Sequence, residues 1–146
     1  MAALAGDHVV VKLDDSSGTL RTFASGDIQS VDLGLTNDQW DVTGFGDAAH
    51  NFINGQLQAP VTIKGFLTTT ALVGTHTVIQ GAFAAGTTVS LEVEVGKNAA
   101  PAAGDPVYKG EFVIASYVPA IATGGAITFT ATLNPATGTA PFWTIK

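Results

Sequence analysis

The sequence predicts an all-β fold, a β-sandwich or barrel, with one flanking α-helix. Several short segments alternate apolar and polar residues and are separated by Gly, Pro, Asp and Asn, which is typical of strands joined by tight turns. Only one segment has the spacing of an amphipathic helix instead. The 146 residues are enough for one hydrophobic core, so we expect a single domain that covers residues 1–146.

The first strands are expected to form a hairpin. Val11 and Leu13 lie on one side of a strand, and turn-forming residues occupy 14–18 before a second strand at 19–23. A third strand, with the same alternation, is expected at 28–35. The N-terminal part of the chain therefore reads as plain β-structure.

Further strands are expected along the rest of the chain, at 61–68, 87–95, 107–118 and 125–133. Pro60 precedes the first of these, in a position where a strand tolerates proline. The low-complexity run 96–105 is interpreted as a flexible connection or hairpin tip. The tail, 134–146, is interpreted as a loop with a short apolar end.

One helix is expected between residues 74 and 86. Four apolar residues fall on a single helical stripe, namely Val78, Ile79, Ala82 and Phe83. Thr75 or Thr77 is the candidate cap of the first turn. Gly86 stands where a helix often ends in the left-handed conformation. Gly81 lies inside the helix and costs it about 1 kcal/mol relative to alanine.

The composition favours a subunit of an assembly. Charged residues make up only 12% of the chain, against roughly 25% in ordinary soluble domains. The net charge is −6 and the six basic residues are scattered, so tight binding of nucleic acid is not expected. The chain has no cysteine, which excludes disulfides, and no apolar run long enough for a membrane helix.

The segment at about 37–59 is the one irregular stretch that carries bulky aromatic residues. We expect it to be a long loop between two strands, with Asp47 in a glycine-bracketed turn. Loops usually bury large apolar groups against something. The sequence favours two packing partners for Trp40, Phe45 and Phe52 equally: the core of their own subunit and a neighbouring chain.

A nucleotide-like motif lies in the same segment. The run GFGDAA at 44–49 matches the letters of the G-x-G-x-x-A dinucleotide fingerprint, which needs a buried strand before it, a helix after it and an acid about 20 residues further on. The preceding residues are polar, and Asn54 and Gly55 interrupt any helix. The next acid after Asp47 is Glu92. We therefore predict no cofactor.

Catalytic and metal sites are not predicted either. The histidines at 8, 50 and 76 lie on separate elements, so they supply no metal-binding pattern. Asp47 and His50 are close enough in sequence for an acid–base pair, but a turn aspartate beside an exposed histidine is the simpler interpretation. Glu92 and Glu94 share one strand face, where a solvated face is a simpler interpretation than a glycosidase pair. We expect no enzyme.

The order of these motifs resembles the major tail protein, the tail tube subunit, of long-tailed bacteriophages. The similarity begins with the run WDVT at 40–43, a Gly-Asp turn at 46–47, and then Phe52 with Gly55. It continues through the strand VTIKGF at 61–66. The helix and the later strands, including YKGEFVIASY and AITFTATL, follow in the family's order.

The resemblance implies a β-sandwich subunit that forms hexameric rings stacked into a tube through which DNA passes. It implies assembly residues and no catalytic ones. On this basis we predict that Trp40, Phe45, Asp47 and Phe52 lie at a subunit interface. Alternation alone suggests that Glu92 and Glu94 face the lumen.

The expected partners are other copies of the chain, tail proteins at the tube ends and DNA as transient cargo that does not stick. The expected location is the virion, after synthesis in the host cytoplasm, and no membrane is involved. Two alternatives remain. A carbohydrate- or ligand-binding β-sandwich would use the same aromatics as a stacking platform. A small hydrolase ranks last.

Overall fold

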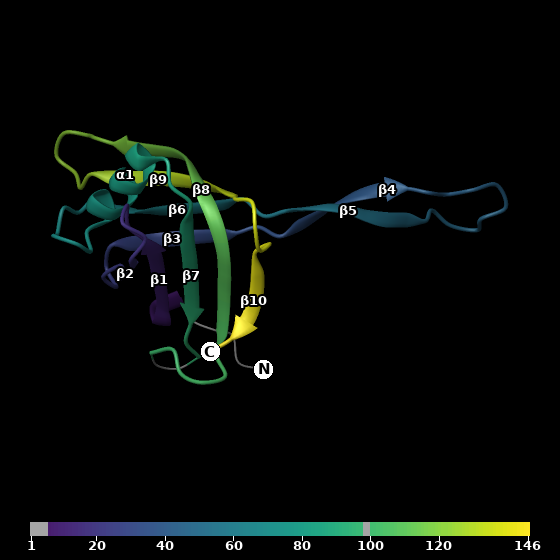
Figure 1. Cartoon of the computed structure of the whole chain (residues 1–146), viewed down its shortest axis with the longest axis horizontal. Helices are drawn as coiled ribbons and strands as arrows, with labels where there is room; N and C mark the ends of the chain where they lie inside the picture. The colour runs from purple at the N-terminus through teal and green to yellow at the C-terminus, as the bar shows by residue number, and fades with distance from the viewer. Residues whose placement is uncertain (1–5, 98–99) are drawn as a thin grey trace.

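The computed structural model describes residues 6–97 and 100–146 and confirms the predicted all-β fold with one α-helix. In chain order the elements are the 3-10 helix η1 (Gly6–His8), strands β1 (Val9–Asp14), β2 (Leu20–Thr22), β3 (Ile28–Leu33), β4 (Thr36–Asp41), β5 (Phe52–Gln58) and β6 (Val61–Phe66), helix α1 (Thr75–Ala85), and strands β7 (Val89–Val95), β8 (Pro106–Ala120), β9 (Thr128–Pro135) and β10 (Phe142–Ile145) (Figure 1). The run predicted to be a connection at 96–105 includes residues 98 and 99, which lie outside the described part.

Eight strands form one sheet, which is folded into two layers. The strand order is β2-β1-β7-β8-β9-β6-β3, and β10 also pairs with β8. The first layer consists of β2, β1, β7, the first half of β8, and β10; the second consists of the second half of β8, β9, β6 and β3. Figure 1 shows the two layers running in different directions. Because the order ends at β2 and β3, the sheet is not a closed barrel.

Strand β8 connects the layers because it is long enough to pair in both. Gly110 pairs with Leu91 of β7, and Tyr108 pairs with Trp143 of β10. Further along, Tyr117 pairs with Ala131 of β9. The register shifts between Ile114 and Ser116, and a bulge of this kind bends a strand and increases its twist.

The core lies between the layers and follows from the alternation of side chains. In β6, Val61 and Ile63 are buried, whereas Lys64 on the other face is exposed. The same alternation places Phe129 and Leu133 of β9 in the core. Each buried aliphatic or aromatic side chain contributes about 1.5–3 kcal/mol relative to exposure. The described core residues form one cluster, which includes part of α1.

Helix α1 ends as predicted but starts differently. The Gly86 amide donates to the Ala82 carbonyl at 3.1 Å, and its φ of 66° is left-handed. Gly74 occupies the N-cap, so the prediction that Thr75 or Thr77 caps the helix is wrong. The Thr75 hydroxyl instead donates to the Phe66 carbonyl at 2.7 Å, which ties the helix to β6. Among the described residues, no helix has the length and apolar character to cross a membrane.

The C-terminal tail is more ordered than predicted. Residues 142–145 form β10, which pairs with the first half of β8. The backbone amide of Lys146 then donates to the Asp105 carbonyl at 2.9 Å. The prediction of a loop-like tail is therefore wrong over these residues. Strand β10 pairs with residues more than 30 positions away in the chain, and such pairing produces no local sequence period from which the strand could be predicted.

Gly65 lies where β6 meets the start of β3. A Cβ atom at this position would be 2.1 Å from the Asp27 carbonyl oxygen. The same carbonyl accepts a hydrogen bond of 2.8 Å from the Phe66 amide, so the backbone cannot move away without breaking that bond. Gly65 is therefore required by close approach of two backbone segments.

Gly65→Ala is expected to destabilise the subunit by at least about 1–3 kcal/mol, the usual cost of overpacking. Gly81→Ala is the matched control, because a Cβ there has only Ser16 nearby, at 3.9 Å. That change should stabilise α1 by up to about 1 kcal/mol. Urea unfolding of both variants measures the two effects, and equal stability of the variants would contradict this assignment.

Tyr108 is a fully buried tyrosine whose hydroxyl has no hydrogen-bond partner among the described residues. Its ring packs edge-on against Trp143, with centroids 5.3 Å apart. Burial raises the pKa of Tyr108. Tyr117 differs, because its hydroxyl lies 2.9 Å from Nδ1 of His76. An unpaired buried hydroxyl costs about 1–3 kcal/mol, whereas a satisfied one contributes about 1 kcal/mol.

Tyr108→Phe should therefore leave the free energy of unfolding unchanged or raise it by about 1 kcal/mol. Tyr117→Phe, which removes a hydroxyl that has a partner, should lower it by about 1 kcal/mol. Chemical denaturation compares the two variants with the unmodified protein. The assignment fails if Tyr108→Phe is destabilised as much as Tyr117→Phe.

Candidate assembly surfaces

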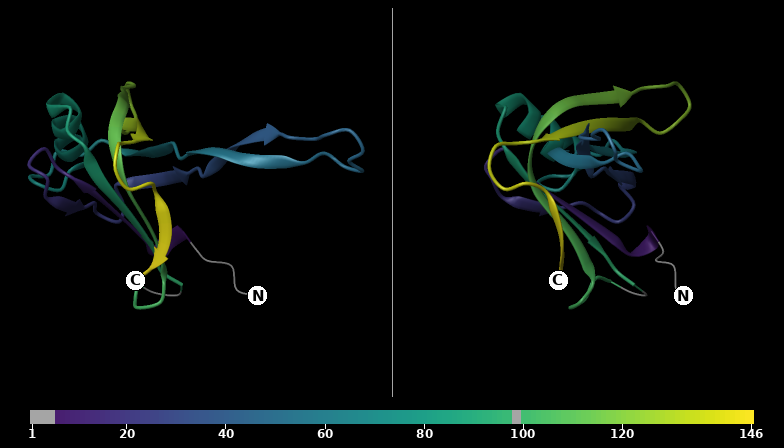
Figure 2. Two further views of the ribbon diagram at one scale, coloured as in Figure 1. Left: turned by 45° about the vertical axis from the view of Figure 1, so that its right-hand side comes forward. Right: turned by 90° about the vertical axis from the view of Figure 1, so that its right-hand side faces the viewer.

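Strands β4 and β5 form a hairpin that projects far from the two-layered body (Figures 1 and 2). They make a separate two-stranded sheet, in which Trp40 pairs with Ile53 and Asp41 with Phe52. The prediction of an irregular loop at about 37–59 is therefore wrong over the two strands, and residues 42–51 form the loop that connects them. The hairpin has no face against its own core, so its sequence lacks the alternation by which strands are recognised.

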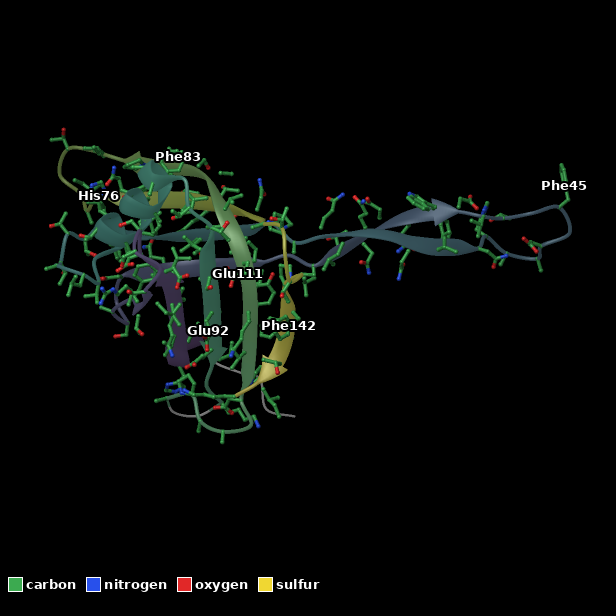
Figure 3. The ribbon with its side chains drawn as sticks, in the orientation of Figure 1. Phe45, His76, Phe83, Glu92, Glu111 and Phe142 are labelled. Carbon is green, nitrogen blue, oxygen red and sulfur yellow. The ribbon has the colours of Figure 1, made fainter. Side chains whose placement is uncertain are left out.

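The aromatic side chains of this hairpin are exposed. Trp40 is 58% exposed, Phe52 is 55% exposed, and Phe45 lies fully exposed at the tip (Figure 3). They do not cover the subunit's own core, so the core is not the packing partner of these aromatic side chains. Isolated two-stranded hairpins are marginally stable in water. This hairpin is thus a surface without a partner in the part of the chain that the structure describes.

The apolar groups occur on both faces of the hairpin. Trp40 and Ile53 are directly opposite each other and share one face. Phe52 immediately precedes Ile53 in β5, so its side chain points to the other face, beside Asp41. A contact that buries the hairpin must therefore cover it on two sides.

The hairpin tip is built by aspartates that accept hydrogen bonds from nearby residues. Asp47 Oδ2 accepts a hydrogen bond of 2.7 Å from the Gly44 amide. Asp41 accepts hydrogen bonds from the hydroxyl and amide of Thr43, which lower the pKa of Asp41. The His50 ring lies 3.5 Å from Asp41 Oδ2, so its nearby carboxylate is Asp41 and not Asp47. This geometry matches a turn aspartate beside an exposed histidine.

The dinucleotide-like run is part of the same tip. Gly46 has a φ of 91°, which the turn requires. The chain then continues into strand β5 rather than into a helix, so no helix N-terminus faces the glycines. No three His, Asp or Glu side chains of the described ranges 6–97 and 100–146 are grouped so that they could hold a metal ion.

Glu92 and Glu94 lie on the outward face of β7, but their surroundings differ. Glu92 is half-buried, with Lys109 at 3.7 Å. Glu94 is only 4% exposed, with Lys12 at 3.2 Å and Lys146 at 3.0 Å. The interpretation of a fully solvated strand face is therefore wrong for Glu94. Burial alone would raise the pKa of Glu94, but hydrogen bonds from Lys146 and Lys12 lower it.

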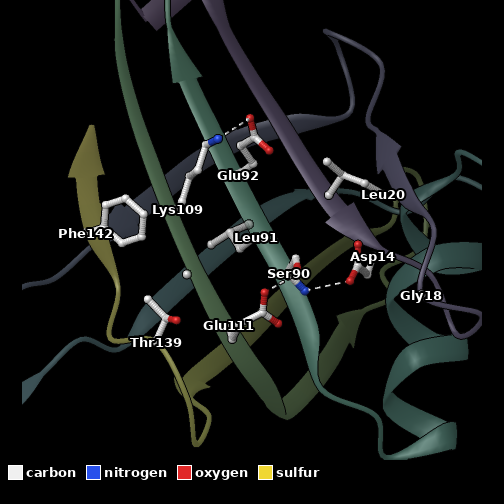
Figure 4. A pocket seen from close by; sticks show the side chains of 11 residues that line it. Asp14, Gly18, Leu20, Ser90, Leu91, Glu92, Lys109, Glu111, Thr139 and Phe142 are labelled. Atoms are coloured by element: carbon white, nitrogen blue, oxygen red, sulfur yellow. Dashed lines mark hydrogen bonds and ion pairs between the residues drawn. The ribbon is translucent and has the colours of Figure 1, made fainter. Parts of the chain in front are cut away.

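A shallow groove of about 500 Å³ lies over β7 and the first half of β8, and Glu92 is one of the residues that line it (Figure 4). Its carboxylates already have partners. Asp14 Oδ2 accepts from the Ser90 amide at 3.0 Å, and Glu111 accepts from the Ser90 hydroxyl at 2.5 Å. Glu92 faces Lys109. The groove is thus a set of cross-strand polar contacts on a sheet face.

Replacing Glu94 by Gln should lower the free energy of unfolding by about 1.5–3 kcal/mol at neutral pH, because hydrogen bonds to a charged group disappear. The pKa of Glu94 is lowered in the folded state, so its contribution exists above the unfolded value of 4.5 and disappears as the pH falls below it. The difference between the two proteins should therefore shrink on acidification. Urea titrations between neutral pH and pH about 3 measure it.

Glu92→Gln is the control, because the more exposed ion pair with Lys109 is worth at most about 1 kcal/mol. A difference between Glu94→Gln and the unmodified protein that is constant with pH would contradict the role given to the Glu94 carboxylate.

No protein-family model matches the chain, and no curated protein matches it. Solved structures do match over nearly the whole length. The tail of an empty gene transfer agent (GTA) particle, refined with C6 symmetry, is 20% identical with a TM-score of 0.71, and the match covers 97% of this chain and 99% of that one.

The SPP1 tail tube is 11% identical with a TM-score of 0.75, covering 99% of this chain and 80% of that one. The baseplate of the anti-feeding prophage, six-fold symmetrised, contains a chain that is 10% identical with a TM-score of 0.65, covering 99% and 97%. At these identities the similarity concerns the fold. The chain has the fold found in the SPP1 tail tube and in the tail of the gene transfer agent.

Proposed function

We propose that the chain is a tail tube subunit, a structural virion protein that assembles into stacked rings around a conduit for DNA. One observation carries this proposal: a subunit with the fold of a tail tube protein projects a hairpin whose two faces carry exposed aromatic groups. A free monomer gains nothing from that surface, whereas an assembly buries it.

Free sheet edges support assembly by strand pairing within a ring. In the first layer, the edge strands β2 and β10 are short, with 3 and 4 residues, which limits pairing with another chain. In the second layer, and within residues 6–97 and 100–146, β3 pairs only with β6, and residues 113–120 of β8 pair only with β9. These two edges run in opposite directions, so β3 of one copy can add antiparallel to β8 of the next.

The direction of the hairpin supports stacking between rings. Strands β4 and β5 extend beyond β3 and β6 and project outward from the same layer (Figure 1). If the second layers join around a ring, their strands run along the ring axis with the tilt usual for barrels, about 35–45°. The hairpin then extends past the edge of its own ring and reaches the next. Trp40, Phe45, Asp47 and Phe52 are the proposed interface residues.

Six subunits per ring are proposed, because the gene transfer agent tail and the anti-feeding prophage baseplate were both treated with six-fold symmetry. Other tail proteins are proposed to close the tube ends. DNA is the proposed cargo, and a net charge of −6 favours its passage without tight binding. Synthesis in the host cytoplasm and incorporation into the virion follow from this role.

The structure gives less support to the alternative, a ligand-binding sandwich. A stacking platform for sugars needs aromatic rings that share one surface. Trp40 and Phe52 point to opposite faces of the hairpin, and Phe45 lies beyond them at the tip. The three therefore do not form such a platform. The proposal assigns the chain no catalytic role.

Replacing Trp40 and Phe45 by serine should yield a folded subunit that no longer forms tubes. Both side chains are exposed in the subunit, so their removal should change its free energy of unfolding by less than about 0.5 kcal/mol. Negative-stain microscopy and sedimentation of the purified protein measure assembly. Circular dichroism measures the fold.

Phe83→Ser is the matched control, because Phe83 is an exposed aromatic on α1, away from the hairpin (Figure 3). It should leave tube formation unchanged. Tubes of normal length from the variant with serine at positions 40 and 45 would contradict the interface assignment. A strictly monomeric unmodified protein would contradict the proposed function itself.

A further inference from the structure

The second layer has one face that the described part of its own subunit leaves uncovered. Cross-strand pairs place the residues of this face in rows, two of which span all four strands. These two rows are Asp32, Thr62, Thr132 and Ser116, and then Ser30, Lys64, Thr130 and Val118. The opposite face of the same strands carries Ile63 and Leu133 and is buried in the core.

The chemistry of this face is distinctive. Small hydroxyl side chains dominate these two rows, and Asp32 and Lys64 are the only charged residues in them. The other lysine and arginine residues of the described chain lie 2.8–3.8 Å from a carboxylate, namely Lys12, Arg21, Lys97, Lys109 and Lys146. Among the lysines and arginines of the described part, Lys64 alone has no ion pair, and it is exposed.

Ring closure decides which way this face points. The first layer and α1 cover the other face of the second layer, which adds bulk on that side. A closed ring has a longer circumference outside than inside, so the bulky side must lie outside. The uncovered face then lines the conduit. This step rests on the proposed function, because it assumes that second layers join edge to edge around a ring.

We propose that the uncovered face of β8, β9, β6 and β3 is the wall of the conduit, and that Lys64 is its contact with the phosphate backbone of DNA. Hydroxyl groups of Ser and Thr and the ammonium group of Lys are common phosphate donors. Each subunit supplies one lysine, and Asp32 lies on the neighbouring strand β3, two residues after Ser30, the cross-strand partner of Lys64. A single lysine near a carboxylate gives a weak and salt-sensitive contact. Such a contact guides DNA without holding it.

This placement differs from the prediction made from alternation alone. Glu92 and Glu94 belong to the outward face of the first layer, so in the proposed ring they lie on the outside of the tube. Glu94 is also neutralised by Lys12 and Lys146. The proposal therefore replaces an acidic wall by a nearly neutral wall rich in hydroxyl groups.

Single-cysteine labelling tests the placement cleanly, because the chain has no cysteine of its own. Lys64→Cys and Lys109→Cys are a matched pair: each removes one exposed lysine from a strand, one on the proposed wall and one on the outward face of the first layer. Each variant is treated, before and after assembly, with a small maleimide and with a maleimide on a bulky polymer that cannot enter the tube.

Before assembly, both reagents should label both variants. After assembly, the bulky reagent should label Lys109→Cys but react at least tenfold more slowly at Lys64→Cys, while the small reagent still reaches both. Equal labelling of the two variants by the bulky reagent in intact tubes would overturn the placement. A failure to form tubes in the unmodified protein counts against the proposed function instead.

The phosphate contact has its own test. Tubes of the unmodified chain, Lys64→Gln and Lys109→Gln are mixed with a short DNA duplex and sedimented over a series of salt concentrations. Lys64→Gln should retain less DNA at low salt, and the slope of log affinity against log salt should fall by about one for each phosphate that the substituted lysine no longer binds. Lys109→Gln should behave as the unmodified chain. Equal retention by all three overturns the assignment of Lys64.

Discussion

Strand β8 belongs to both layers of the sandwich, and the rest of the subunit depends on this double membership. Its first half pairs with β7 and β10 and its second half with β9, so one continuous backbone fixes the layers around a shared core. The same bend leaves residues 113–120 of β8 unpaired along one side. With β3, they form the two free edges of a single four-stranded layer. The path of β8 thus determines both the buried core and the strand edges that are free to pair with other copies.

The hairpin of β4 and β5 follows from this arrangement. It extends beyond β3 and β6, so its Trp40 and Phe52 do not reach the described core and stay more than half exposed. Exposed apolar groups on both faces make the free hairpin marginal, and contacts with neighbours would stabilise it by mass action. A low content of charged residues suits a subunit that covers much of its surface in this way.

The sequence correctly predicts the strands that have one buried face and one exposed face. The prediction fails for strands that have no buried face. Val61 and Ile63 alternate with polar residues because β6 has a core side and an open side. The hairpin lacks such a side, so its strands have the sequence pattern of a loop. The pairing of β10 with β8 and the burial of Glu94 under Lys146 depend on contacts between distant residues, which no local pattern encodes. The aromatic groups of the candidate interface are visible in the sequence, but their exposure is not.

A three-dimensional reconstruction of tubes assembled from the purified chain tests the proposed arrangement of the subunits. We expect β3 of each subunit to pair with residues 113–120 of β8 in its neighbour. We also expect the hairpin of residues 36–58 to be buried against the adjacent ring. Tubes in which the hairpins remain free in solvent, or neighbours joined through β2 and β10, would contradict this arrangement.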